Sequence, residues 1–463
     1  MSPLYIMRMY ERNPNEKGNG RTMKHGWKTI ALAAVLLPVL AACSSSTGSA
    51  PAGGQQAPKT AEPNEPAKPA EDVKLTFSIW GNDDHKKTIE EIAAKYKTIR
   101  PNVTVEVMTI PFNDYQQKLS IMMSSRTAPD IGWLSDTMIP QFLQSGQLAD
   151  VSSIRSDPAY AFDDMFPSTL APLTKDGKLY GVPFSTPPSM IFYNKTLFDQ
   201  KGLKTPAELY KEGRWTYDEM LKAAKAISDP AKGVYGVKLV REWKSWSSTL
   251  YSLVKAYGGD VLSKDGTKFL LNSPEGEKAV QLYYDMMFRD GVHPKPGDQT
   301  TFESGKLGMF RDVYSSVTKA RAIKDFEWDI APMPKGPNGA GAWVGFAGYA
   351  VFQGGKHPKE ATEFLKFVSS KESMAATSKY FVPSRKSALE SDAFQNAGDR
   401  PTKEGIRIAV LEQMNAAEGL PLHKNWQQID TKVQTHLDYL YTQSASVKEV
   451  LQKMEQDVTP LLK

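Results

Sequence analysis

Cysteine is nearly absent from this sequence of 463 residues, in which Cys43 is the only one. A single cysteine excludes an internal disulfide and a cysteine-rich metal site. The six histidines are scattered along the chain, and no two of them have the spacing of a metal-binding pair. We therefore expect neither a bound metal ion nor another cofactor.

The signature motifs of common enzymes are also missing. The chain contains no G-x-S-x-G, no H-E-x-x-H and no G-x-x-x-x-G-K-[ST] sequence. A serine hydrolase, a zinc protease and a P-loop nucleotidase are therefore not expected. A pair of catalytic carboxylates has no fixed spacing in sequence, so a glycosidase-type enzyme stays open as an alternative.

Excess positive charge, the usual mark of a nucleic-acid-binding protein, is confined to the N-terminal end. The chain has 57 basic and 52 acidic residues, and residues 1–43 hold six of the basic and two of the acidic ones. The rest of the chain is close to neutral, so we expect no nucleic acid among its partners.

The apolar run of residues 30–42 is too short for a transmembrane helix, which needs about 20 residues. Lys24 and Lys28 precede it and small residues end it, which is the arrangement of a secretory signal peptide. The sequence "LAAC" at 40–43 resembles the bacterial lipoprotein processing motif. That resemblance implies a lipid on the Cys43 thiol and a mature chain that begins there. An ordinary signal peptide with an incidental cysteine is the alternative.

Two further N-terminal segments flank this signal. Residues 1–22 precede Met23, where a normal signal of residues 23–42 starts, and we predict that they are a dispensable upstream extension. Residues 43–72 contain no aromatic residue and almost nothing to bury, which predicts a disordered linker. The folded body is expected to begin at Val73.

From Val73 onward, strand and helix patterns alternate. "VKLTFSIW" at 73–80 has apolar residues at every second position, and "HKKTIEEIAAKYKTI" at 85–99 has them at helical spacing. Strand patterns at 102–110 and 130–134 flank a further helix around Leu119. This alternation predicts an α/β architecture. About 390 residues are too many for one ordinary core, so we expect two lobes.

One helix start is marked clearly in "RWTYDEM" at 214–220. Thr216 and Glu219 have the spacing of a capping box, and Trp215 can pack on Met220 as a hydrophobic staple. We therefore predict that Trp215 is a structural residue.

Several of the nine tryptophans stand at strand ends or loop edges, where α/β folds build ligand clefts. A flat indole matches the apolar face of a sugar ring, and a carboxylate accepts hydrogen bonds from its hydroxyls. For any one of these tryptophans the alternative is a core position. Together they predict a sugar-binding cleft in which Trp80, Trp133, Trp246, Trp343 and Trp426 stack on or border the sugar, while Asp83 and Asp136 accept hydrogen bonds from its hydroxyls.

Nearly all of residues 73–463 resembles the extracellular solute-binding proteins of ABC importers, in the sugar-binding group that includes maltose-binding protein. The similar segments occur in a consistent order: "KLTFSIWGNDD", "APDIGWLSDTMIPQFLQSGQLADVS", "DGKLYGVPFSTPPSMIFYNKTLFDQKGL", "FESGKLGMF", "WDIAPMPKGPNG" and "AVFQGGKHPKEATEFLKFVSSKESM". The resemblance implies a type II periplasmic-binding-protein fold, with the ligand between two α/β lobes. The implied lobes are residues 73–187 with 347–382 and residues 188–346 with 383–463, joined by crossings at 183–194, near Gly345 and near Pro383.

The resemblance also implies ligand contacts at particular positions. These are Trp80 with Asp83 or Asp84, Trp133 with Asp136, Trp426, and Tyr314 where relatives carry a tryptophan. The choice between Asp83 and Asp84 stays open in the sequence.

These observations predict a binding protein without catalytic turnover, held by lipid on the outer face of the membrane of a bacterium with a single membrane. Its expected partners are a carbohydrate, most simply an oligosaccharide, and the permease of an ABC importer, and we expect a monomer. The alternatives are a secreted, lipid-anchored carbohydrate-active enzyme and the same fold with a non-sugar solute.

Overall fold

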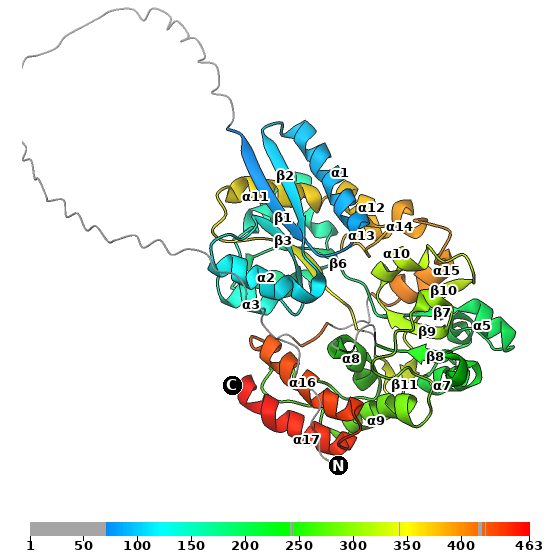
Figure 1. Ribbon diagram of the computed structural model, residues 1–463. Helices are drawn as coiled ribbons and strands as arrows, with labels where there is room; N and C mark the ends of the chain where they lie inside the picture. Colours follow the sequence, from blue (N-terminus) through cyan, green and yellow to red (C-terminus); the bar gives the residue numbers. More distant parts are fainter. Residues whose placement is uncertain (1–70, 241–242, 244, 342, 415–418, 422) are drawn as a thin grey trace, which may run out of the picture. The chain divides into compact units, whose positions relative to one another are not determined.

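The computed structural model describes residues 71–240, 243, 245–341, 343–414, 419–421 and 423–463. The predicted extension, the signal peptide, Cys43 and the linker up to residue 70 lie outside the described residues. From residue 71 the chain is built around two β-sheets with helices packed on them (Figure 1). In this described part, no helix has the length and apolar character needed to cross a membrane.

The first sheet forms the centre of lobe I. Its strand order is β2 (Val103–Thr109), β1 (Val73–Ile79), β3 (Ile131–Ser135), β13 (Ala347–Val351) and β6 (Val182–Ser185). β1 runs parallel to β2 and β3, whereas β13 is antiparallel to both of its neighbours. All four apolar residues of the predicted alternation, Val73, Leu75, Phe77 and Ile79, are buried on one face, which confirms the strand.

Helices cover both faces of this sheet, because successive side chains of a strand point to opposite faces. Trp133 packs into the core under α1 and α11, and its neighbour Leu134 packs into the core under α2 and α3. The helices of lobe I are α1 (Asp83–Ile99), α2 (Phe112–Ser124), α3 (Ile139–Gln144), α4 (Pro167–Leu170), α11 (Pro358–Val368), α12 (Lys371–Thr377) and α13 (Lys386–Leu389). The expected boundary put residues 383–463 in lobe II, but Ala388 of α13 packs into the core of lobe I. A short hairpin of β4 (Thr174–Lys175) and β5 (Lys178–Leu179) is added to them.

The second sheet forms the centre of lobe II. Its strand order is β10 (Trp328–Pro332), β7 (Met190–Asn194), β9 (Leu307–Asp312) and β8 (Tyr235–Lys238). β7 is antiparallel to β10 and β9, and β8 is parallel to β9. Ile191 and Tyr193 face one core, and Met190 and Phe192 face another, so this sheet is also covered on both sides.

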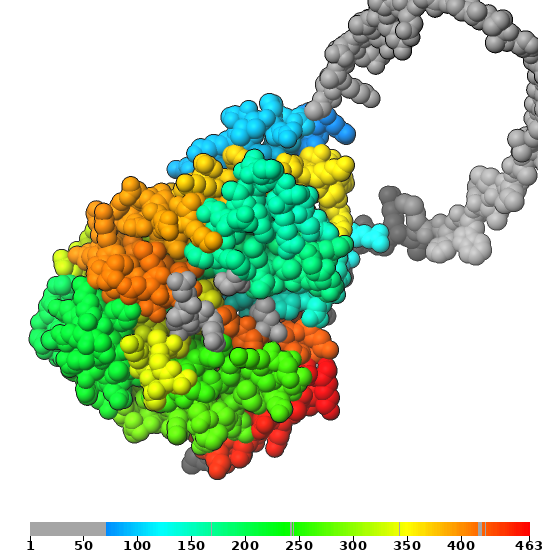
Figure 2. Space-filling model, turned by 180° about the vertical axis from the view of Figure 1, so that it is seen from behind, coloured from blue at the N-terminus to red at the C-terminus, as the bar shows by residue number. Residues whose placement is uncertain are grey.

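Segments that are distant in sequence complete lobe II. Asn272 Nδ2 donates a hydrogen bond of 2.7 Å to Glu455 Oε2 and so joins the start of α9 to α17, and the red C-terminal part lies against green residues in Figure 2. The helices are α5 (Lys195–Gln200), α6 (Pro206–Lys211), α7 (Tyr217–Ile227), α8 (Trp246–Ala256), α9 (Pro274–Phe288), α10 (Val317–Ala320), α14 (Asp392–Gln395), α15 (Lys403–Ile406), α16 (Trp426–Tyr441) and α17 (Val447–Val458). The hairpin of β11 (Lys335–Gly336) and β12 (Gly339–Ala340) belongs to the same lobe.

The helix start at Thr216 is present, but the capping box is only half formed. The Thr216 hydroxyl accepts the backbone N–H of Glu219 at 3.2 Å. The Glu219 carboxylate instead pairs with Lys222 at 2.8 Å, because a solvated lysine one turn on competes for it. Trp215 is 1% exposed and donates its indole N–H to Pro332 O at 2.9 Å, which confirms its structural role.

Candidate functional site

The chain passes between the two sheets in three neighbouring segments, residues 185–189, 343–347 and 382–384, which we call the crossing belt. β6 ends at Ser185 and β7 begins at Met190, and the other two segments run beside this crossing. Backbone hydrogen bonds join the segments: Ser189 N to Trp343 O (2.7 Å), Gly345 N to Pro187 O (2.8 Å) and Thr186 N to Val382 O (3.2 Å). The belt therefore lies where the family resemblance predicts the crossings.

Several polar atoms in and beside the crossing belt are buried and have no hydrogen-bond partner among the described residues. They are Asp136 Oδ2, Thr186 Oγ1, Trp343 Nε1 and Ser384 Oγ. An unpaired buried polar atom costs about 1–3 kcal/mol, and folded proteins contain few of them. Hydroxyl groups both donate and accept hydrogen bonds, so this region is chemically suited to a ligand rich in hydroxyls.

Asp136 follows directly after β3, at the end of the first sheet next to the crossing belt. Its backbone N–H donates to Phe346 O at 3.2 Å, and its Oδ1 accepts the Thr137 N–H at 2.8 Å. Burial raises the pKa of the Asp136 carboxyl to about 7, against two backbone hydrogen bonds that lower it. Near neutral pH this side chain can therefore accept or, when protonated, donate a hydrogen bond.

Trp343 stands in the middle crossing segment with its ring against lobe II. The Arg311 guanidinium lies over the indole at 5.2 Å from the ring centroid and donates to Ser248 Oγ at 3.0 Å. A Cβ at Gly345 would lie 3.0 Å from indole Cη2, so the absence of a side chain there leaves room for the ring. Trp343 is 9% exposed, with the Arg311 guanidinium on its ring.

A cavity of about 250 Å³ is lined by residues of both lobes. Gln116, Thr137 and Gln141 contribute from lobe I, and the segment at the start of α16 contributes from lobe II. A second cavity of about 210 Å³ shares two lining residues with the first, His423 and Lys424. The full lining of the first cavity is Gln116, Thr137, Gln141, His423, Lys424, Trp426, Gln427 and Gln428.

Of the predicted aromatic contacts, Trp426 is the one that lines this cavity. Trp246 lies behind it, with the two rings stacked at 6.1 Å and 15°. Trp80 is half-buried at the end of β1 and packs edge-on against Tyr115 at 5.1 Å and Trp133 at 5.2 Å. Trp80 and Trp343 therefore keep some exposed surface, whereas Trp246 supports another ring.

Trp133 and Tyr314 lie inside the cores of their lobes and are completely buried. Phe184 of β6 packs on the Trp133 ring at 4.8 Å, because both side chains point to the same face of the sheet. Phe394 packs on Tyr314 at 5.2 Å. Neither ring has a free face in this conformation, so the stacking roles implied by the resemblance do not fit these two positions. Trp243 packs on His293 and Tyr441.

Asp83 and Asp84 form the first turn of α1, and both are exposed. Asn82 caps this helix by accepting the His85 N–H at 3.1 Å. Carboxylates in a first turn are stabilised by the helix dipole, which accounts for both residues without a ligand. No group of three or more His, Cys, Asp or Glu side chains within the described ranges could hold a metal ion.

Several residues of the site carry no signal in the sequence. Amide and hydroxyl side chains on helix faces are common on any protein surface, and only the approach of α16 to α2 and α3 turns them into a cavity lining. The residues that sequence reasoning missed are Gln116, Thr137, Gln141, Thr186, Arg311, Ser384, His423, Lys424, Gln427 and Gln428.

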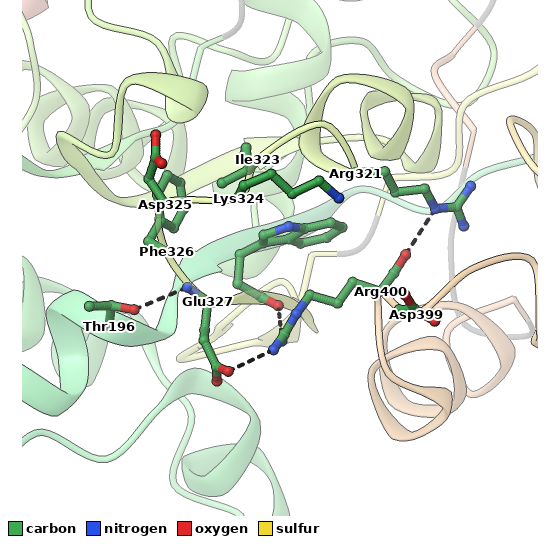
Figure 3. Close-up of a pocket in the computed structure, with 10 residues that line it drawn as sticks. Thr196, Arg321, Ile323, Lys324, Asp325, Phe326, Glu327, Asp399 and Arg400 are labelled. Carbon is green, nitrogen blue, oxygen red and sulfur yellow. Dashed lines mark hydrogen bonds and ion pairs between the residues drawn. The ribbon is translucent and has the colours of Figure 1, made fainter.

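A larger cavity of about 480 Å³ lies within lobe II alone (Figure 3). Three of its charged side chains, those of Arg321, Glu327 and Arg400, bind each other or the backbone. Arg400 donates to Trp328 O at 2.7 Å and pairs with Glu327 at 3.1 Å, and Arg321 Nε donates to Arg400 O at 2.9 Å. These arginines join the start of β10 to the segment before α15. We therefore interpret the residues around this cavity as structural and do not place the ligand there.

Comparison with known proteins gives consistent matches. The family described as bacterial extracellular solute-binding protein matches residues 82–375. The diacetylchitobiose binding protein of Streptomyces coelicolor is 28% identical over 303 residues, 62% of this chain and 67% of that protein. The maltodextrin-binding protein of Bacillus subtilis is 24% identical over 453 residues, 95% of this chain and 97% of that protein.

The fold is also matched among solved structures. An ABC substrate-binding protein from Listeria monocytogenes, in complex with cycloalternan, superposes with a TM-score of 0.76 at 22% identity, over 85% of this chain and 99% of that one. The two sheets and the crossing belt are therefore parts of a known two-lobed architecture.

Proposed function

This chain belongs to the family of bacterial extracellular solute-binding proteins, and from that premise we propose that it captures an oligosaccharide outside the membrane and delivers it to the permease of an ABC transporter. The observation that carries the proposal is the cavity shared by the two lobes, whose lining has four glutamines, a threonine, a histidine, a lysine and Trp426, with no carboxylate among the described residues. Amide and hydroxyl side chains beside a flat ring suit a polyhydroxylated ligand. The relatives that bind diacetylchitobiose and maltodextrin support the same ligand class.

The second cavity supports a ligand longer than one sugar ring. It shares His423 and Lys424 with the first and continues along the loop at Ser263 to Gly266. Two adjoining cavities favour a chain of sugar rings over a single ring. A ligand that touches both lobes binds the closed arrangement more tightly than the open one and so stabilises it. The closed arrangement is the state that a permease can distinguish.

The ligand contacts that we propose combine flat rings with unpaired polar atoms. Trp426 and Trp343 would offer their rings to the apolar faces of the sugar, and Trp80 would border it. Asp136, Thr186 and Ser384 would pair with its hydroxyls, since each carries a buried oxygen without a partner among the described residues.

A thermal-shift screen against mono- and oligosaccharides is expected to raise the melting temperature, because a ligand that binds only the folded state stabilises it. Maltodextrins and chito-oligosaccharides should shift it more than their monosaccharides. Polyols, glycerophosphodiesters and peptides test the non-sugar alternative. A shift by one of these with none from any sugar contradicts the proposed ligand class, and steady formation of cleaved sugar in proportion to protein contradicts a binding role.

We also propose that Cys43 carries a lipid that anchors the protein on the outer face of the cell membrane, on the basis of "LAAC" at 40–43. A tethered binder keeps a high local concentration near its permease, limited by the reach of the linker. Cys43→Ala is expected to abolish both lipid attachment and lipoprotein-type cleavage. Metabolic labelling with a fatty acid measures this, and label that persists in the variant contradicts the anchor. A chain that starts at residue 72 should melt and bind sugar like the mature protein.

A further inference from the structure

A second tryptophan and a carboxylate lie directly behind Trp426. Trp246, the first residue of α8, is 1% exposed and stacks on Trp426 with 6.1 Å between ring centroids and 15° between ring planes. Its indole N–H donates a hydrogen bond of 2.6 Å to Asp430 Oδ1. An indole that donates to a carboxylate makes a charge-assisted bond, which is shorter and stronger than a neutral one. The orientation of the Trp246 ring is therefore set by Asp430.

Asp430 is itself held in place on α16. Trp426, Asp430 and Gln434 are spaced by four residues, so they form one stripe along the helix. Gln434 Nε2 donates to Asp430 Oδ2 at 2.5 Å, while Oδ1 accepts from Trp246. Both carboxylate oxygens are used by side chains that do not belong to the cavity lining. The carboxylate thus acts between two helices instead of facing the ligand.

The backbone that carries Trp426 is already fixed by other bonds. Trp426 N donates to His423 O at 3.1 Å, and the Asn425 side chain donates to Leu461 O at 2.7 Å. The remaining freedom of Trp426 is the rotation of its ring, and the stacked Trp246 ring restricts that rotation. Offset stacking of aromatic rings at this separation is worth about 0.5–1.5 kcal/mol beyond burial.

We propose that Asp430 is a positioning residue, which acts through Trp246 to hold the Trp426 ring in the orientation that faces the cavity between the lobes. The proposal rests on the proposed function, in which Trp426 contacts the sugar. Burial keeps the pKa of Asp430 raised to about 6, so the carboxyl is retained here at some cost to stability. An apolar residue would fill this buried position without the cost of burying a carboxylate. The carboxylate at position 430 is therefore better explained by its hydrogen bond to Trp246 than by packing.

The test compares Asp430→Leu with the conservative Asp430→Asn, which keeps an Oδ1 acceptor, and with Asp438→Asn as an exposed control on the same helix. Two stacked indoles give an exciton couplet in circular dichroism, and its loss in Trp246→Phe and in Trp426→Phe assigns it. Asp430→Leu is expected to remove most of the couplet, and both asparagine variants are expected to keep it. This measurement needs no ligand.

Calorimetry with maltotriose and with diacetylchitobiose gives the second readout. Asp430→Leu is expected to weaken binding of whichever sugar binds the wild type by roughly tenfold, or about 1.4 kcal/mol, while Asp430→Asn stays within about twofold. An unchanged couplet in folded Asp430→Leu overturns the proposal, as does unchanged affinity after the couplet is lost. If neither sugar binds the wild type, the couplet alone decides the role of Asp430, and the proposed function is decided separately by the thermal-shift screen.

Discussion

Replacing Asp136 with asparagine is expected to leave the stability of the protein unchanged near pH 4 and to raise it at pH 8. Burial raises the pKa of the Asp136 carboxyl from its usual 3.8 to about 7. The folded protein therefore binds this proton more tightly than the unfolded chain does, and the free energy of unfolding falls as the pH rises from about 4 to about 7. The full loss is on the order of 4 kcal/mol, and asparagine avoids it because it does not ionise. Urea unfolding at a series of pH values measures the difference.

Asp265 provides the matched control for this experiment. It is exposed, and hydrogen bonds from Ser263 and Thr267 lower its pKa to about 2. The folded state therefore favours the ionised Asp265 carboxylate. Asp265→Asn removes this carboxylate and should lower the stability of the protein at pH 8. If the free energy of unfolding changes with pH in the same way in the wild type and in Asp136→Asn, Asp136 is not buried as the structure has it.

Replacing Trp426 with alanine is expected to weaken sugar binding by at least thirtyfold. Trp426 lines the cavity that both lobes share, and removal of a central aromatic anchor from a binding site costs about 2–4 kcal/mol. The measurement is calorimetry with the sugar that gives the largest shift in the thermal screen. Because the ring is almost fully buried, the variant also loses stability, so its folding is checked at the temperature of the titration.

Tyr439→Ala serves as the control on the same helix. Tyr439 is 47% exposed and is not part of the cavity lining, so its removal should leave affinity unchanged. Trp426→Leu keeps apolar volume without a flat ring and is expected to bind nearly as weakly as Trp426→Ala. Wild-type affinity in a folded Trp426→Ala protein would mean that the sugar lies elsewhere, with the crossing belt as the first place to search.

Local patterns in the sequence predict the elements of lobe I well. Alternation over 73–80 predicts β1, and helical spacing from Ile89 to Tyr96 predicts α1; the structure has β1 at Val73–Ile79 and α1 at Asp83–Ile99. Both patterns show which side of a single strand or helix is buried. They can be read without knowing which elements pack against it. The order of the family-like segments extends this success to the two-lobed fold.

The sequence does not show which tryptophans lie in the core and which contact a ligand. Trp246 and Trp426 each begin a helix and Trp133 lies within the short strand β3, and nothing in their local sequence shows which of them faces a ligand. In the structure Phe184 and Phe381 cover Trp133, Trp426 covers Trp246, and Trp426, although almost fully buried, lines the cavity. Each of these neighbours is distant in sequence, so the choice between core and site is made by packing.

The sequence by itself determined the α/β lobes and the family, and it predicts an export signal that ends at the single cysteine. Each of these is encoded in short contiguous segments. Only the tertiary structure decided which ring can face a ligand, which carboxylate is buried, and which amides line a cavity. Asp83 and Asp136 are both acids that follow a strand, yet one is exposed in the first turn of α1 and the other is buried beside Phe346. The physical reason is that burial and pKa depend on atoms brought together from across the chain, and the crossing belt brings together residues almost 200 positions apart.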